Sequence, residues 1–400
     1  MPALVIKPER EKSLRNHHPW VFSGSIEREE DGLEVGQNVD LVTTEGLFLA
    51  RASYNPHSQI RARIWTFNEN EKVDPDLFSR RIKAAIAVRK QLGFFDSDAS
   101  KKKTACRLIH GESDLFPGLI VDQYADQLVI QFLSAGTELW KSTLIDLIVE
   151  ATGIENVYNR SDPDVRQLEG LTKESGLISG KVPNQLSIIE NNISFLIDVR
   201  DGHKTGFYLD QRNNRKLVQH LSNNRDVLDC FSYTGGFSLN ALTGGARSVT
   251  AIDSSADALS TAKVNTINNH LPLERVEFIT GDVFQWLRKF RDSRRDFDLI
   301  TLDPPKFAQT YSQVEKASRG YKDINLLAFK LLRPGGILVT FSCSGGVSAE
   351  LFQKIVAGAA LDAGVNTVII DRLHQSGDHP VNLNFPEGSY LKGLICIKNN

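Results

Sequence analysis

The chain has 400 residues, 41% of them hydrophobic and 24% charged, and a net charge of −2 at pH 7. This length predicts two or three domains, and the composition is that of a globular protein. A chain that is basic throughout is excluded, although basic residues can still gather on one face. No apolar run approaches about 18 residues, so we expect no membrane span. The four cysteines are widely spaced, which disfavours disulfides and a zinc site and favours a cytoplasmic location.

The first half of the chain predicts two small domains. Residues 1–72 contain short strand-like runs separated by Gly, Asn and Pro, so we expect a β domain that ends in the polar linker at 68–72. Residues 73–189 predict a middle α+β domain, with a helix from Phe78 to Leu92 and a hairpin near 119–132. Basic residues gather near the start of the chain, and a further basic run lies at 101–103.

From residue 190 to residue 400 the pattern alternates between strand and helix. Such alternation predicts an α/β domain with a doubly wound parallel sheet, which resembles the Rossmann architecture. The turn at 388–392 favours an antiparallel hairpin at the edge of this sheet, completed by the last strand.

A candidate cofactor site follows the first strands of this domain. An apolar strand runs into a glycine turn and then a helix at 227–238, and glycine lets backbone amides approach a ligand closely. The spacing is not GxGxxG, which disfavours a dinucleotide. Acidic residues occur at three successive strands: Asp229, Asp253 and Asp282. Asp253 could accept hydrogen bonds from ribose hydroxyls and Asp282 from an adenine amino group, but either residue could equally cap a helix.

The strongest chemical signal is a pair of strand ends near residues 303 and 343. The segment 297–302 ends in Asp303-Pro304-Pro305-Lys306, and the next apolar run ends in Ser342-Cys343-Ser344. In open α/β sheets ligands bind outside the carboxyl ends of the strands, so Asp303 and Cys343 should face one pocket. A carboxylate and a thiol in one pocket suggest covalent attack on a planar, polar ring. If that ring is cytosine, a thiolate that adds to its carbon 6 would activate carbon 5 for methylation. Asp303 could hold the edge of the base and Phe307 could stack on it. Cys343 could otherwise be a small buried residue.

Together these motifs resemble the bacterial cytosine-5 methyltransferases of large-subunit (23S) ribosomal RNA, of the RlmI type. The resemblance covers nearly the whole chain. Its landmarks are the segments 18–24, 58–63, 111–114, 202–212, 230–237, 303–307, 319–325 and 341–344.

The resemblance implies an N-terminal PUA domain, a middle α+β domain and a class I methyltransferase domain that uses S-adenosylmethionine. It implies Cys343 as the nucleophile and Asp303 as a residue that contacts both base and cofactor. Lys306 is a further candidate catalytic residue. It stands where many RNA cytosine-5 enzymes carry a second cysteine that releases the product, so release would need another base or water here. Arg212 would shape the floor of the cofactor site, or else form a buried salt bridge. The remaining cofactor residues would be Asp229, Phe231, Tyr233, Thr234, Gly235, Asp253 and Asp282.

A PUA domain also implies that RNA is the partner. The early basic residues would contact phosphates: Lys7, Arg10, Lys12 and Arg15. Phe231 and Tyr233 stand where the family usually has glycine, so the resemblance does not predict the backbone path of the cofactor loop. A homodimer is a further expectation.

Three other functions fit the sequence less well. Asp-Pro-Pro before an aromatic residue is similar to motifs of amino-methyltransferases, which would methylate a base nitrogen without a thiol. A non-catalytic RNA-binding assembly factor could retain the same cofactor pocket. A nicotinamide dehydrogenase is the weakest alternative, because the glycine spacing is wrong.

Overall fold

The computed structural model describes residues 1–95, 104–308 and 311–399, so the basic run at 101–103 lies outside the described residues. The chain divides into two compact units, each assembled from separate stretches of sequence. The first unit consists of Met1–Ile188, Ile197–Leu209 and Gly377–Gly388, and the second of Ile189–Leu196, Asp210–Ser376 and Ser389–Asn400. None of the helices within the described residues is long and apolar enough to cross a membrane.

The N-terminal part of the first unit is a six-stranded sheet with the order β2-β6-β5-β4-β1-β3. In β4 buried and half-buried residues alternate, and the buried Val39 and Leu41 join the core of this sheet. The short strands expected within residues 1–72 are present, among them β4, β5 and β6. The elements are β1 (Ala3–Ile6), α1 (Glu11–Arg15), β2 (Trp20–Phe22), β3 (Ile26–Glu29), β4 (Asn38–Val42), β5 (Phe48–Tyr54) and β6 (Ile60–Thr66).

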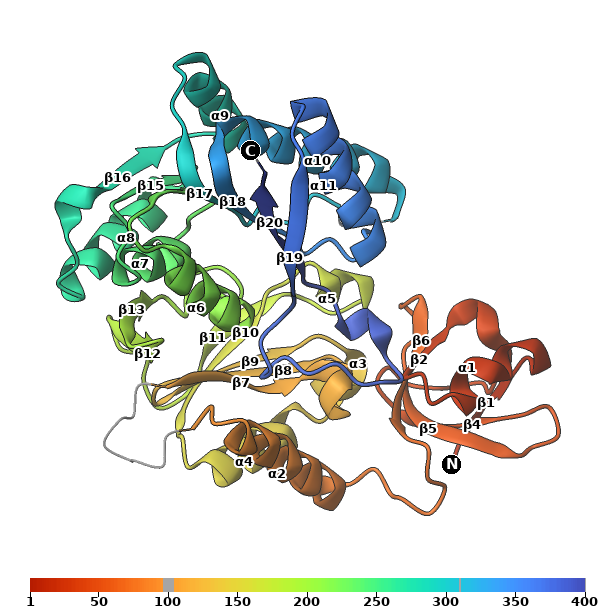
Figure 1. Cartoon of the computed structure of the whole chain (residues 1–400). Helices are drawn as coiled ribbons and strands as arrows, with labels where there is room; N and C mark the ends of the chain where they lie inside the picture. The colour runs from red at the N-terminus through yellow and green to blue at the C-terminus, as the bar shows by residue number, and fades with distance from the viewer. Residues whose placement is uncertain (96–103, 309–310, 400) are drawn as a thin grey trace. The chain divides into compact units, whose positions relative to one another are not determined.

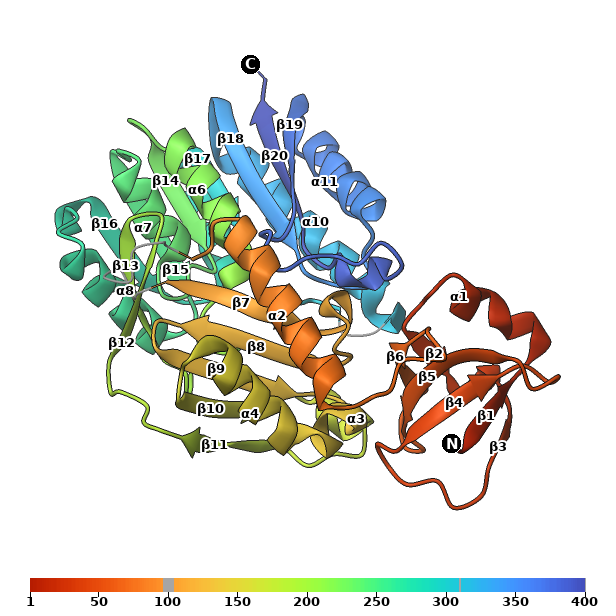
Figure 2. The same ribbon diagram turned by 90° about the horizontal axis from the view of Figure 1, so that it is seen from below.

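A five-stranded sheet with the order β11-β10-β9-β8-β7 follows in the same unit. Figure 2 shows α2 (Pro75–Gln91) and α4 (Lys141–Thr152) on one face of this sheet. Helix α2 begins where Asp74 accepts a hydrogen bond from the Leu77 amide at 2.9 Å, a common N-cap. The other elements are β7 (Ala105–His110), β8 (Leu119–Tyr124), β9 (Gln127–Phe132), α3 (Ala135–Leu139), β10 (Asn156–Ser161), α5 (Val165–Leu168) and β11 (Glu174–Ser179).

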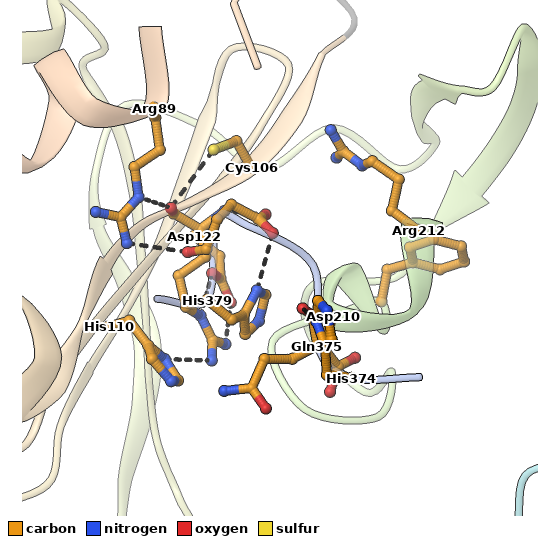
Figure 3. A network of polar contacts seen from close by, with 12 residues as sticks. Arg89, Cys106, His110, Asp122, Asp210, Arg212, His374, Gln375 and His379 are labelled. Carbon is orange, nitrogen blue, oxygen red and sulfur yellow. Dashed lines mark hydrogen bonds and ion pairs between the residues drawn. The ribbon is translucent and has the colours of Figure 1, made fainter. Parts of the chain in front are cut away.

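Buried charges tie the segment 377–388 into the first unit. Arg107 forms two hydrogen bonds to the Asp122 carboxylate, at 2.8 and 2.7 Å, and its backbone amide donates to Asp378 at 3.0 Å. Arg89, which is labelled in Figure 3, donates to the carbonyl oxygen of Arg107 at 2.9 Å. Buried charges are stable only when they are paired, so this network fixes the late segment against a sheet built from early residues.

The second unit is built on a seven-stranded sheet with the order β16-β15-β14-β17-β18-β20-β19. The strands are parallel except β20, which runs antiparallel to both neighbours. A two-stranded sheet pairs β12 (Leu186–Glu190) with β13 (Ile193–Ile197). The strands are β14 (Asp226–Cys230), β15 (Ser248–Asp253), β16 (Val276–Thr280), β17 (Phe297–Leu302), β18 (Leu332–Ser342), β19 (Thr367–Leu373) and β20 (Lys392–Lys398).

Helices cover both faces of this sheet, because successive strand residues point to opposite sides. Leu228, Leu338 and Leu394 pack with α9, α10 and α11, whereas Val227 and Val339 pack with α6 and α7. These helices are labelled in Figure 1. The helices are α6 (Arg212–Leu221), α7 (Gly236–Thr243), α8 (Ala256–Asn268), α9 (Val283–Asp292), α10 (Val314–Leu331) and α11 (Ala349–Ala363).

The predicted α/β class is confirmed, with a β domain before it. The last strand, β20, is antiparallel, as expected, and it pairs with β19 at the edge of the sheet, where β19 is outermost. The division of the chain into three domains at 72 and 189 stays a prediction.

Candidate active site

Four neighbouring parallel strands of the second unit end at the same edge of the sheet. The ends are Cys230 in β14, Asp253 in β15, Leu302 in β17 and Ser342 in β18. Because ligands of such sheets bind outside the carboxyl ends, the loops that follow these strands form the candidate site.

The loop after β14 has an unusual backbone. Phe231 and Tyr233 have φ angles of 63° and 49°, in the left-handed region that favours glycine. Bulky residues rarely adopt this conformation, which costs on the order of 1–3 kcal/mol and is found most often at ligand sites. The aromatic residues therefore follow a backbone path that glycine could also follow.

Gly235 closes this loop and starts α7. Its φ angle is 86°, and a Cβ atom here would lie 2.7 Å from the Leu239 side chain and 3.0 Å from Ala262. Glycine is therefore required at this position both by conformation and by space.

Asp253 holds the loop in place. Its Oδ2 accepts a hydrogen bond from the Tyr233 amide at 2.8 Å, and its Oδ1 accepts one from the Ser255 amide at 2.9 Å. The residue that caps α8 is Ser255, not Asp253. Asp253 is half-buried, so part of the residue remains accessible. In the predicted site a ribose would lie next to this carboxylate.

Asp229 and Asp282 differ sharply in environment. Asp229 is fully buried in β14, where it accepts hydrogen bonds from the hydroxyls of Ser238 and Thr301, both at 2.6 Å. Burial raises the pKa of Asp229 to about 6. Asp282 is exposed and caps α9 through the Gln285 amide at 2.9 Å, so the capping role considered for it is present.

Two buried hydroxyl groups in the same loop have no partner within the described residues. They are the Oγ of Ser232 and the Oγ1 of Thr234. An unsatisfied buried polar group costs about 1–3 kcal/mol, so a polar ligand that bonded to these two hydroxyls would stabilise the loop. The loop thus offers free hydroxyls beside a carboxylate, a set that suits a polar cofactor.

The loop after β17 is joined to the loop after β18. The backbone amide of Ala308 donates to the Ser344 hydroxyl at 3.1 Å, and the Tyr321 hydroxyl of α10 lies 3.0 Å from the same oxygen. Ser344 and Tyr321 are both fully buried. This contact holds the loop after β17 and the loop after β18 together; that Asp303 and Cys343 share one pocket stays a prediction.

Cys343 is the one cysteine of the chain that is half-buried; the other three are buried. It lies directly after β18, between Ser342 and Ser344. Burial raises the pKa of the neighbouring Tyr321 phenol, and a Cys343 thiolate raises it further. Of the four thiols, that of Cys343 is therefore the one best placed to meet a substrate.

Lys306 and Phe307 follow the two prolines. Lys306 is exposed, and the Phe307 ring packs 4.7 Å from Tyr321 and 6.0 Å from Phe284, measured between ring centroids. Phe307 is half-buried, so part of its ring remains accessible.

A second lysine lies beside the thiol. Lys392, the first residue of β20, pairs with Ser342 across the strands, and its ammonium donates to the Ser344 carbonyl at 2.8 Å. Burial lowers the pKa of Lys392 to about 8; the thiolate of Cys343 opposes this shift and the charge of Lys306 adds to it.

Comparison with known proteins shows the family of this chain. Residues 172–381 match the family described as S-adenosylmethionine-dependent methyltransferase, and residues 4–67 match the PUA-like domain. "Ribosomal RNA large subunit methyltransferase I" of Cronobacter sakazakii is 48% identical over 98% of both chains. The protein of the same name from Aliivibrio fischeri is 47% identical over 98% of both chains.

The chain belongs to the family of these large subunit methyltransferases I. It is an S-adenosylmethionine-dependent methyltransferase with a PUA-like domain. A solved structure from Streptococcus mutans, described as a SAM-dependent methyltransferase, has a TM-score of 0.84 at 22% identity and covers 99% of this chain and 100% of its own. Another methyltransferase, complexed with SAH, has a TM-score of 0.85 at 21% identity, with the same coverage. At this identity the two structures confirm the fold alone.

The residues present fit the family's cofactor. Asp253 suits the ribose hydroxyls, and the free hydroxyls of Ser232 and Thr234 suit a polar group such as a carboxylate or an amine. The assignment of individual cofactor residues stays a prediction.

Arg212 begins α6, and its guanidinium lies 3.5 Å from Glu190. The same carboxylate also pairs with the buried Arg215 at 2.6 Å. The salt bridge considered for Arg212 is thus present, and a role toward the cofactor stays a prediction.

Three of the four basic residues predicted to contact RNA are exposed in the first unit: Arg10, Lys12 and Arg15. Arg15 pairs with Glu11 at 2.7 Å, and the half-buried Lys7 donates to the Gly24 carbonyl at 3.2 Å. Exposed pairs are weak, so Arg15 can exchange Glu11 for a phosphate at little cost.

Sequence reasoning missed Lys392 and Ser344 as parts of this site. Ser344 was visible as the neighbour of Cys343, but its link to Ala308 depends on the packing of two loops. Lys392 carried no signal, because its place beside Ser342 follows from the insertion of β20 next to β18.

Proposed function

We propose that the protein methylates carbon 5 of one cytosine in large-subunit (23S) ribosomal RNA through a covalent adduct on Cys343. The observation that carries this proposal is the half-buried thiol of Cys343, at the end of β18 beside the Asp303 loop. The relatives' printed name, which specifies ribosomal RNA of the large subunit, supports the choice of substrate.

The chemistry follows from the residues at the strand ends. The Cys343 sulfur adds to carbon 6 of the cytosine, which makes carbon 5 nucleophilic. S-adenosylmethionine supplies the methyl group that carbon 5 accepts. Asp303 holds the polar edge of the base, and Phe307 supports one of its faces. Loss of the proton on carbon 5 then expels the thiolate and restores the aromatic ring.

The first unit would hold the RNA. We propose that residues 1–72 act as the RNA-binding PUA-like domain and that its exposed basic residues contact phosphates. Such contacts make binding weaker as the salt concentration rises. A cytoplasmic location and a homodimer are also part of the proposal.

The test is methyl transfer from labelled S-adenosylmethionine to unmodified large-subunit ribosomal RNA, followed by identification of the nucleoside. Wild type should form 5-methylcytidine, and Cys343→Ala should lose at least roughly 10³-fold in rate because the nucleophile is gone. Cys396→Ala is the matched control, since Cys396 is a buried thiol of β20 in the same sheet. Activity in Cys343→Ala, or a product methylated at nitrogen, would favour an amino-methyltransferase instead. RNA binding without any methyl transfer would favour an assembly factor.

A further inference from the structure

The reaction needs a base, because carbon 5 must lose its proton before the thiolate can leave. Lys392 lies beside the loop that carries Cys343. Its backbone pairs with Ser342 and its ammonium donates to the Ser344 carbonyl at 2.8 Å, so it contacts the residues on both sides of Cys343. The thiol loop and this amine are therefore held together by β18 and β20.

The surroundings of Lys392 favour its neutral form. The side chain is half-buried, and its charge faces the thiol of Cys343 and the ammonium of Lys306. From α10, the Tyr321 phenol has a raised pKa and stays neutral. Within the described residues no carboxylate forms an ion pair with Lys392. With a pKa of about 8, roughly a tenth of the amine is uncharged at pH 7, which is the range of known catalytic lysines.

We propose that Lys392 is the general base that removes the carbon-5 proton and so releases the methylated RNA from Cys343. The inference rests on the covalent mechanism proposed above. The neutral amine of Lys392 takes the proton from carbon 5, and the electrons of that C–H bond form the carbon 5–carbon 6 double bond. The bond between carbon 6 and the Cys343 sulfur breaks and leaves the thiolate. The new ammonium returns its proton to water, so atoms and charges balance.

The experiment separates the formation of the adduct from its release. Enzyme, labelled S-adenosylmethionine and large-subunit ribosomal RNA are mixed for a single turnover, and the RNA–protein adduct is followed on a denaturing gel. Lys392→Arg keeps the cation and a donor for the Ser344 carbonyl, but arginine cannot act as a base near neutral pH. Lys392→Met removes both the charge and the base. Lys398→Met is the matched control, because Lys398 is in the same strand and also donates to backbone carbonyls.

Both Lys392 variants should transfer one methyl group and then accumulate the methylated adduct, with release slowed roughly 10²-fold or more. The release rate of wild type should rise with pH through about 8, as the amine loses its proton, and Lys392→Arg should lack this rise. Lys398→Met should turn over like wild type.

Two results would overturn the inference. One is normal release in Lys392→Arg. The other is slow adduct formation without accumulation, which would mean that Lys392 only positions the loop of Cys343. If wild type formed no adduct and no 5-methylcytidine, the proposed function itself would fail, and this outcome is distinct from the other two.

Discussion

The charge state of the buried Asp229 affects the stability of the second unit. Its pKa is raised to about 6 by burial, so the fold favours the protonated carboxyl. The stability that comes from this preference is present below the ordinary pKa near 4 and is lost as pH rises through about 6.

We therefore expect Asp229→Asn, which cannot ionise, to remove this pH dependence. Between pH 4 and pH 7 the free energy of unfolding of wild type should fall relative to the variant by up to about 3 kcal/mol. Urea unfolding across this range measures the difference. Asp31→Asn, at an exposed turn, is the control and should track wild type. A constant difference between Asp229→Asn and wild type would contradict the prediction.

At the scale of residues, the sequence could predict groups that follow their own strand. Cys343, Asp253 and Asp303 were found this way, because a strand end is visible as the end of an apolar run. Lys392 could not be found, since its role depends on a cross-strand pair with Ser342, 50 residues earlier in the chain. Nor could the sequence show that Asp229 would be fully buried and would accept hydrogen bonds from two hydroxyl groups.

At the scale of elements, the loop between β14 and α7 combines a tight path with bulky residues. Tyr233 has a φ angle of 49°, which glycine adopts without strain and alanine does not. We expect Tyr233→Gly to be more stable than Tyr233→Ala by about 1 kcal/mol, as measured by thermal or urea unfolding. The comparison uses two small residues, so the loss of the ring is common to both.

The control is the same pair of substitutions in a helix. At the exposed Lys354 in α11, glycine should be less stable than alanine by about 1 kcal/mol, so the order of the pair reverses. If alanine were the better residue at both positions, the backbone of Tyr233 would not be strained.

Element boundaries followed the apolar pattern closely in the second unit. For example, β15 ends at Asp253 and β16 ends at Thr280, each directly after an apolar run. The antiparallel pair predicted at the edge of the sheet is present as β20 and β19, and β19 is the outermost strand. The apolar sequence of β20 does not predict which of these two strands is outermost, because such a run fits an edge strand and an interior strand alike.

At the scale of the whole molecule, a late segment completes an early unit. Asp378 is fully buried in the first unit and accepts the Arg107 amide at 3.0 Å. Asp378→Ala should lower the free energy of unfolding by roughly 1–3 kcal/mol, because a buried amide loses its acceptor. Leu383→Ala, at a side chain that is 98% exposed in the same segment, should have little effect. Equal stability of the two variants, measured by urea unfolding, would contradict this.

The way the chain passes between its units also sets an order of events during synthesis. Residues 1–188 leave the ribosome long before Gly377–Gly388, which belongs to the same unit. At a synthesis rate of about 5–20 residues per second, the first unit lacks its last segment for on the order of 10–40 s. Until then the acceptor for the Arg107 amide is missing, so the nascent first unit is open to proteases and to chaperones that hold unfinished chains. A stop codon just before residue 377 would thus destabilise the first unit, which contains the N-terminus, as well as remove the end of the chain.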